Sequence, residues 1–193
     1  MAYARDAEDP TYKDAPKTAL RDALWAEQHG LCAYCEGPLK AGRTRIEHWA
    51  PQSEAPERQL DYRNLLLCCD GNAGCGRAEL FHCDVRKGNT ALTLNPTDER
   101  IEHRVTFGRT GVQVLGGDAQ AEVDDVLGLN VESLLARRRE LVQGLQRQMS
   151  LRFKGRPTSK VWLERAIARL EATPRPFGRS QLAYLRDRLR RLP

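Results

Sequence analysis

The sequence lacks a long apolar run, an apolar leader segment, internal repeats and low-complexity tracts. No apolar run approaches the roughly 18 residues that a membrane-spanning helix needs, which argues against a transmembrane protein and against a membrane partner. The polar start, Met1 to Asp6, has no apolar core of the kind found in secretory signals, so we expect a cytoplasmic protein. A composition of 40% hydrophobic and 30% charged residues excludes a disordered chain and indicates a globular protein of one or two domains.

Cysteine is present six times, and every cysteine lies between Cys32 and Cys83. In a reducing compartment, clustered cysteines are more often metal ligands than disulfide partners. The two-residue gap in Cys32-Ala-Tyr-Cys35 allows both thiolates to reach one tetrahedral Zn²⁺ from a tight turn. A redox motif can share this spacing, but the further thiols downstream favour structural zinc over a thiol-disulfide oxidoreductase.

The second half of a zinc site has to come from Cys68, Cys69, Cys75 and Cys83. Adjacent residues of an extended segment point to opposite sides, so we expect one of Cys68 and Cys69 to be a buried apolar filler rather than a ligand. The residue types alone leave the choice among these thiols open.

The same window carries four polar residues suited to phosphodiester hydrolysis, Glu47, His48, Asn64 and Asp84. Thr44 to Glu47 can form a short strand that leaves His48 at its end, facing a cleft. An imidazole with a pKa near 6.5 suits a general base that deprotonates water. Carboxylates are the hard ligands that Mg²⁺ prefers, and we expect Asn64 to hydrogen-bond the loop beside His48 and orient its ring.

The order of these motifs resembles the HNH (ββα-metal) endonuclease superfamily. The shared pattern is Cys-x-x-Cys after a helix, acid-His-x-x-Pro, an Asn with Leu-Leu-Leu behind it and a Cys five residues on, then Cys-x-x-x-Lys-Gly. The resemblance implies that His48 is the general base, that Glu47 and Asp84 hold a catalytic Mg²⁺ or Mn²⁺, and that Asn64 is the central Asn. It implies a structural zinc held by Cys32, Cys35, Cys69 and Cys83.

The chain departs from the superfamily pattern at two places. Thirteen residues, Asp70 to His82, separate the third and fourth cysteines where two are usual, and this insert brings Cys75 as an alternative ligand. The last member of the triad is an Asp, which leaves Asn89 and His82 as alternatives to Asp84.

These departures are similar to those of the HNH nuclease subunits (PtuB-like proteins) of Septu-type and retron-linked anti-phage systems. The similarity lies in Asn-Leu-Leu-Leu-Cys-Cys-Asp-Gly-Asn and in His-Cys-Asp-Val-Arg-Lys-Gly-Asn, and it covers roughly residues 20–130. It implies a defence effector that works with an ATPase subunit of the SMC/ABC-like type.

Hydrophobic periodicity predicts an α+β protein. We expect a helix over residues 17–29, a short strand over 91–94, and a hairpin formed by 101–107 and 112–115. Three further helices follow, the first capped by Asn130, the second over residues 158–171 and the third beginning at Ser180. The expected fold is thus a ββα-metal core with a structural zinc (residues 1–130), followed after the hairpin by a basic helical region (residues 131–193).

Charge divides the chain at the same place. Residues 1–130 carry 15 Lys and Arg against 21 Asp and Glu, whereas residues 131–193 carry 16 against 5. A basic region joined to an acidic metal site favours a polyanionic partner, DNA first and RNA second, or else an acidic protein surface. We expect Arg86 and Lys87 to contact phosphates in a metal-dependent endonuclease; the alternative is a catalytically silent, zinc-braced module that only binds nucleic acid or protein.

Overall fold

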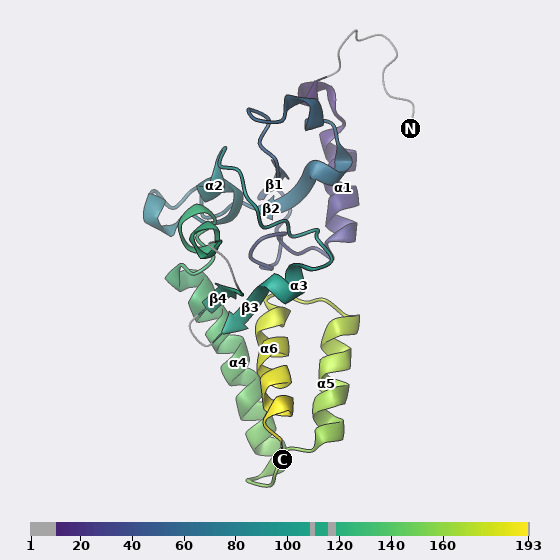
Figure 1. Ribbon diagram of the computed structural model, residues 1–193, viewed down its shortest axis with the longest axis vertical. Helices are drawn as coiled ribbons and strands as arrows, with labels where there is room; N and C mark the ends of the chain where they lie inside the picture. Colours follow the sequence, from purple (N-terminus) through teal and green to yellow (C-terminus); the bar gives the residue numbers. More distant parts are fainter. Residues whose placement is uncertain (1–10, 109–110, 116–118, 193) are drawn as a thin grey trace.

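The computed structural model describes residues 11–108, 111–115 and 119–192, and it has an α+β fold (Figure 1). Two antiparallel strand pairs and a set of short helices form one end of the molecule, and three longer helices form the other. The elements in chain order are α1 (Lys17–Glu27), β1 (Thr44–His48), β2 (Leu65–Cys69), α2 (Cys83–Lys87), α3 (Ile101–Arg104), β3 (Val105–Gly108), β4 (Gly111–Val114), α4 (Glu132–Phe153), α5 (Lys160–Ala172) and α6 (Gly178–Arg190). Short 3-10 turns (Tyr12–Asp14, Pro56–Arg58, Tyr62–Asn64, Ala78–Leu80) and one π-helical segment (Glu122–Val126) connect them.

Strands β1 and β2 form the ladder on which the rest of this end is built. Their register pairs Thr44 with Cys69 and His48 with Leu65. The run Leu65 to Cys68 is buried throughout, as expected for a strand covered on both faces, and helices α1 and α2 both pack against it. The order β1, β2, α2 thus gives a ββα unit with a long connection, residues 49–64, between its strands.

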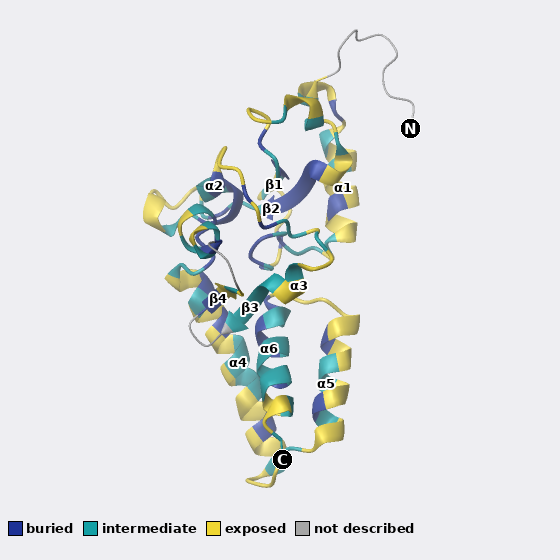
Figure 2. Ribbon diagram, in the orientation of Figure 1, coloured by how far each residue is buried: buried dark blue, intermediate teal, exposed yellow. Residues whose placement is uncertain are grey.

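Two hydrophobic cores hold the molecule together. The larger one joins the ββα unit to Val112, Val123 and Leu127, and it also takes in Leu134 of α4 and Phe177 just before α6. The smaller core, Met149, Leu163, Leu170 and Leu185, lies between α4, α5 and α6. The first turns of the helical region therefore share a core with the ββα end, where Figure 2 shows β2 in the dark blue of buried residues.

The predicted helices are confirmed in position, with corrections at their ends. Asn130 does not cap α4; Val131 occupies that position, and the Asn130 side chain instead bonds the backbone N–H and carbonyl of Val112 at 2.8 and 2.9 Å. The third of these helices starts at Gly178 rather than at Ser180. The side chain of Ser159 caps α5 by accepting from the N–H of Trp162.

Two predicted strand segments are wrong. Residues 91–94 form no strand; the N–H groups of Thr93 and Leu94 donate to the Glu122 carboxylate, which replaces a strand partner. The hairpin is confirmed at β3 and β4, but Ile101–Arg104 forms a helical turn instead of extending β3. Residues 109–110 of the hairpin connection and residues 1–10 lie outside the described residues.

Candidate functional site

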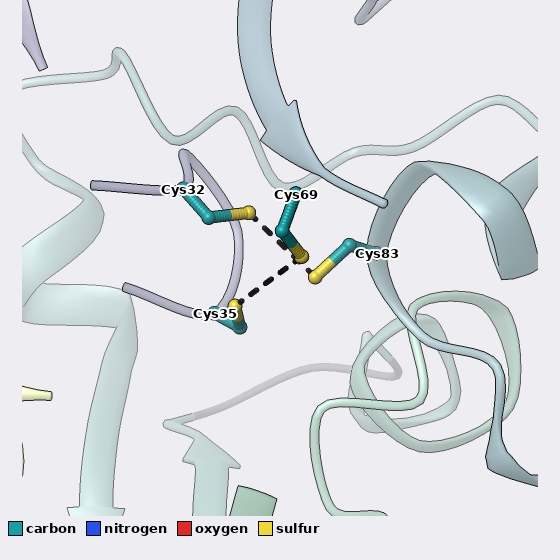
Figure 3. A group of neighbouring side chains, drawn as sticks. All are labelled: Cys32, Cys35, Cys69 and Cys83. Carbon is teal, nitrogen blue, oxygen red and sulfur yellow. Dashed lines mark hydrogen bonds between the residues drawn. The ribbon is translucent and has the colours of Figure 1, made fainter. Parts of the chain in front are cut away.

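Four cysteines from three separate segments converge on one point (Figure 3). Cys32 and Cys35 lie on the turn after α1, Cys69 ends β2, and Cys83 begins α2. All of their sulfur atoms lie within 4.8 Å of one another, with Cys32 to Cys83 at 3.7 Å and Cys35 to Cys69 at 3.9 Å. These are the four ligands that the resemblance implies.

The sulfur spacing fits a tetrahedral zinc ion and not a pair of disulfides. Four sulfurs at the usual Zn–S distance of about 2.3 Å lie about 3.8 Å apart along each edge of the tetrahedron, whereas disulfide sulfurs lie about 2.05 Å apart. Burial, followed by hydrogen bonding with Cys32, raises the pKa of Cys83, and a bound cation would offset this cost of ionising the buried thiol. Four buried or half-buried thiols at this spacing therefore form a candidate structural zinc site.

The remaining two cysteines are not members of the four-sulfur group, although the Cys68 thiol interacts with that of Cys32. Cys68 is fully buried in the larger core, on the opposite face of β2 from Cys69, as expected for an apolar filler. Cys75 is exposed in the insert, where its thiol donates to the carbonyl of Arg77. Neither belongs to the four-sulfur group.

His82, an alternative for the last triad position, faces the sulfur group instead. Its Nδ1 lies 3.1 Å from Cys83 Sγ and 3.8 Å from Cys69 Sγ, and its ring is buried. A ring N–H directed at a thiolate stabilises the anionic form, as does the Gly37 N–H, which donates to Cys35 Sγ at 3.3 Å. The geometry thus groups His82 with the zinc candidate rather than with His48.

A second centre lies beside the first, in an open cavity of about 390 Å³ at the end of β1. It is lined by Glu47, His48 and Asp84, which sequence reasoning singled out, and by Asn89, the other alternative for the triad position. The remaining lining residues include Tyr12, Arg45, Pro51 and Gln52. Strand β1 supplies the first two residues and α2 supplies the third, so the ββα unit brings acid, imidazole and acid to one wall.

The two carboxylates repel each other inside this wall. Burial, and after it Asp84, raises the pKa of Glu47 to about 8, although Lys87 works in the opposite direction. Lys87 Nζ lies 2.6 Å from Glu47 Oε1, the Tyr34 hydroxyl donates to the same oxygen at 3.1 Å, and Arg45 forms an ion pair with Asp84. Two hard oxygen donors that raise each other's affinity for a cation are a suitable donor set for Mg²⁺ or Mn²⁺.

His48 is held in one tautomer. Its Nε2 lies 2.9 Å from the Gln59 carbonyl oxygen, which can only accept, so Nε2 carries the hydrogen and Nδ1 keeps a lone pair. Gln52 Nε2 lies 3.2 Å from that Nδ1 and 3.1 Å from Nε2, and the Tyr12 ring meets the imidazole edge-on at 4.5 Å. Burial lowers the pKa of His48, so the ring is a neutral base at neutral pH.

Asn64 lies beneath the cavity and does not line it. Its side chain accepts from the Ala50 N–H at 2.8 Å and donates to the carbonyls of Ala50 and Arg58 at 3.1 and 3.3 Å. The Trp49 N–H donates to the Asn64 carbonyl at 3.0 Å. A fully buried amide with these bonds ties β2 to both ends of the loop that follows His48.

Of the two cations predicted to contact phosphates, Lys87 is placed differently from that expectation, whereas Arg86 is half-buried and its predicted contact stays a prediction. Lys87 is 2% exposed and donates to the His48 carbonyl at 3.2 Å as well as pairing with Glu47, so it lies under the cavity and not on its rim. Arg86 packs against Gly128 and donates to the Asp125 carbonyl at 2.8 Å.

Sequence reasoning missed Arg45, Tyr34 and Gln52. Arg45 could have been predicted, because it precedes Glu47 by two residues and residues i and i+2 of a strand share a face. The Tyr34 contact with Glu47 and the Gln52 contact with His48 depend on how the loops fold back, which no local pattern encodes.

No protein-family model and no curated protein matches this chain. No helix among the described residues combines the length and the apolar character needed to cross a membrane.

Proposed function

We propose that this protein is a metal-dependent endonuclease of the HNH type, hydrolysing phosphodiester bonds in nucleic acid, with DNA as the first substrate to test. One observation carries the proposal: a neutral, tautomerically fixed imidazole and two carboxylates line a single open cavity of a ββα unit that a four-cysteine centre braces. Resemblance of the sequence motifs to HNH nucleases supports the same reading.

The roles of the side chains follow from their contacts. His48 Nδ1 takes a proton from the attacking water, while the bond from Nε2 to the Gln59 carbonyl holds the ring and stabilises the imidazolium that forms. Asn64 keeps the loop carrying that carbonyl in place through Ala50 and Arg58. Glu47 and Asp84 would hold Mg²⁺ or Mn²⁺, which when bound stabilises the charge on the scissile phosphate and the leaving oxygen.

Cleavage assays with purified protein test this function. The protein is expected to cut DNA or RNA only when Mg²⁺ or Mn²⁺ is added, and His48→Ala is expected to lower the rate by about 10²–10⁴ without loss of zinc. His103→Ala is the matched control, because His103 is exposed on α3 and lies outside the cavity. Cleavage by His48→Ala at the native rate would refute the assignment.

A binding module without catalysis is the second candidate, and a specific observation favours it. Both acids already have cationic partners, Lys87 on Glu47 and Arg45 on Asp84, and these compensate charge that a divalent ion would otherwise neutralise. Calorimetric titration separates the two functions: an endonuclease binds Mn²⁺ in the cavity and loses this binding in Asp84→Asn, whereas a silent module binds nucleic acid without binding Mn²⁺ there.

Within this proposal the protein is the effector of an anti-phage system that works with an ATPase subunit of the SMC/ABC-like type. The sequence similarity to PtuB-like subunits supports this partner, and the basic helices α4 to α6 offer a surface on which it can dock. Copurification of the two proteins, and cleavage that changes with ATP only when the ATPase is present, is the expected result. If cleavage were equally fast with and without the ATPase, the proposal of a nuclease would stand and the proposal of this partner would be refuted.

A further inference from the structure

A buried arginine lies at the junction of the four-cysteine centre and the helical region. Arg138, on the second turn of α4, is 5% exposed. By contrast, the other arginines of residues 131–192 are either half-buried or exposed at the surface. Its Nη1 donates to the Leu129 carbonyl at 2.5 Å, whereas its Nε and Nη2 are buried without a hydrogen-bond partner. Burying a guanidinium with two unused N–H groups is costly unless a negative charge compensates it.

The segment carrying Cys35 lies on the same junction. Phe177 lies against Gly37, and the Phe177 N–H donates to the Glu36 carbonyl at 3.0 Å. The Arg138 guanidinium carbon lies 5.9 Å from the centre of that Phe177 ring and 5.7 Å from the Phe107 ring. Glu36 itself pairs with Arg179 of α6 at 2.5 Å, so both α4 and α6 begin against the cysteine turn.

The four-cysteine centre carries a negative charge when zinc is bound. A Zn²⁺ ion with four thiolates carries a net charge of −2, and such a buried anion needs positive partners that stay within the protein. Burial lowers the pKa of Arg138, and the charges that work in the opposite direction are those of Cys35, Glu36 and Cys83, in that order. The geometry agrees, because Cys35 Sγ and Phe177 both lie against Gly37. The N–H groups of Gly37 and His82 supply hydrogen bonds to the sulfurs but no fixed charge.

We propose that Arg138 is the internal counter-ion of the zinc–thiolate centre, and that this pairing docks the basic helical region on the ββα end. Zinc then has a second role besides bracing the ββα unit: it keeps α4 and α6 in place. Without zinc, Arg138 keeps only the Leu129 carbonyl as a hydrogen-bond partner and shares the Glu36 carboxylate with Arg179, so the docking weakens. The proposal depends on zinc binding and not on nuclease activity.

Zinc release from the full-length protein tests the counter-ion. Release to a chromogenic chelator is expected to be on the order of tenfold to a hundredfold faster in Arg138→Met, as for other residues that support metal ligands. Arg138→Lys, which keeps the charge, is expected to release zinc at close to the native rate. Arg139→Met is the matched control, because Arg139 is the next residue of α4, exposed and paired with Glu132. Folded Arg138→Met that releases zinc at the native rate would overturn the proposal.

Amide hydrogen exchange on the unmodified protein gives a readout that needs no variant. Removing zinc is expected to speed exchange in residues 132–141 and 178–186, where α4 and α6 begin, more than in the distal residues 160–172 of α5. Unchanged exchange at the beginning of α4 and α6 after zinc removal would contradict the docking role, even if Arg138→Met failed to fold.

Discussion

At the scale of single residues, the cavity is governed by one buried ion pair. Lys87 and Glu47 are side chains with 1% and 6% exposure, and their partner atoms lie 2.6 Å apart. A sequence pattern presents Lys87 as one of two consecutive cations and suggests a phosphate contact. The contact with Glu47, forty residues earlier, depends on the packing of α2 on β2 and is visible only in the fold.

Removing the Lys87 ammonium is expected to destabilise the protein. Lys87→Met is expected to lower the free energy of unfolding by about 3 kcal/mol, because it leaves Glu47 buried without its cation. This is the low end of the usual cost of breaking a buried ion pair, since Glu47 can take up a proton and lose its charge. Urea denaturation measures this difference. Adding Glu47→Gln to the variant removes the uncompensated acid and is expected to recover part of the loss; additive losses would show that the two side chains do not interact.

Proton competition at Glu47 makes metal binding dependent on pH. Because burial and Asp84 raise the pKa of Glu47 to about 8, a proton competes with a divalent ion for this carboxylate at neutral pH. Below that pKa, affinity for Mn²⁺ is therefore expected to rise by about tenfold per pH unit, and to level off above it.

Isothermal titration with Mn²⁺ at pH values from 6 to 8.5 measures this dependence. Glu47→Gln is the comparison: it is expected to bind Mn²⁺ more weakly and to lose the steep rise with pH. A native protein whose Mn²⁺ affinity is flat across this range would contradict the assignment of Glu47 as the proton-linked ligand.

At the scale of elements, local pattern accounts for the helices, whereas the identity of the cysteine group came from the resemblance to HNH nucleases. The spacing after Asn64 that this resemblance implies selects Cys69 over Cys68, and strand alternation explains why the neighbour points into the core. The strand predicted for residues 91–94 does not form, because the apolar alternation there reflects the burial of Leu92 and Leu94 and not strand pairing. Their N–H groups bond the Glu122 carboxylate from a distant segment, an interaction without a local signature.

The cysteine group predicts opposite outcomes for two cysteines of the same region. Cys69→Ser is expected to lose most of its zinc, and with it much of the roughly 10 kcal/mol that structural zinc contributes to folding. Cys75→Ser, at an exposed position, is expected to keep its zinc and its unfolding temperature. Elemental analysis together with thermal unfolding measures both. Zinc loss in Cys75→Ser alone would move the fourth ligand into the insert.

At the scale of the whole molecule, the far end of α4 and the start of α5 lie at the opposite end of the molecule from β1 (Figure 1), and positive charge collects there. Residues 141–163 contain no Asp or Glu. They carry five exposed cations, which we call the distal tip: Arg147, Arg152, Lys154, Arg156 and Lys160. None of the five forms an ion pair with an acid in the part of the chain that the structure describes, whereas Arg137 and Arg139 pair with Glu140 and Glu132 nearer the ββα end.

The distal tip is expected to extend the nucleic-acid contact well beyond the cavity. Helix α4 has 22 residues and spans about 33 Å, close to one turn of B-form DNA, so a duplex that reaches both ends must be at least about ten base pairs long. Arg152→Ser with Arg156→Ser is expected to weaken binding to such a duplex and to lower the slope of log affinity against log salt by about 1.8, as two lost phosphate contacts require.

Fluorescence anisotropy at several salt concentrations measures the slope, with Arg137→Ser and Arg139→Ser as the control pair whose cations are already neutralised. Each lost phosphate contact reduces the number of counter-ions released on binding and so lowers the slope. An unchanged slope in the tip variant would therefore assign these cations to a protein partner.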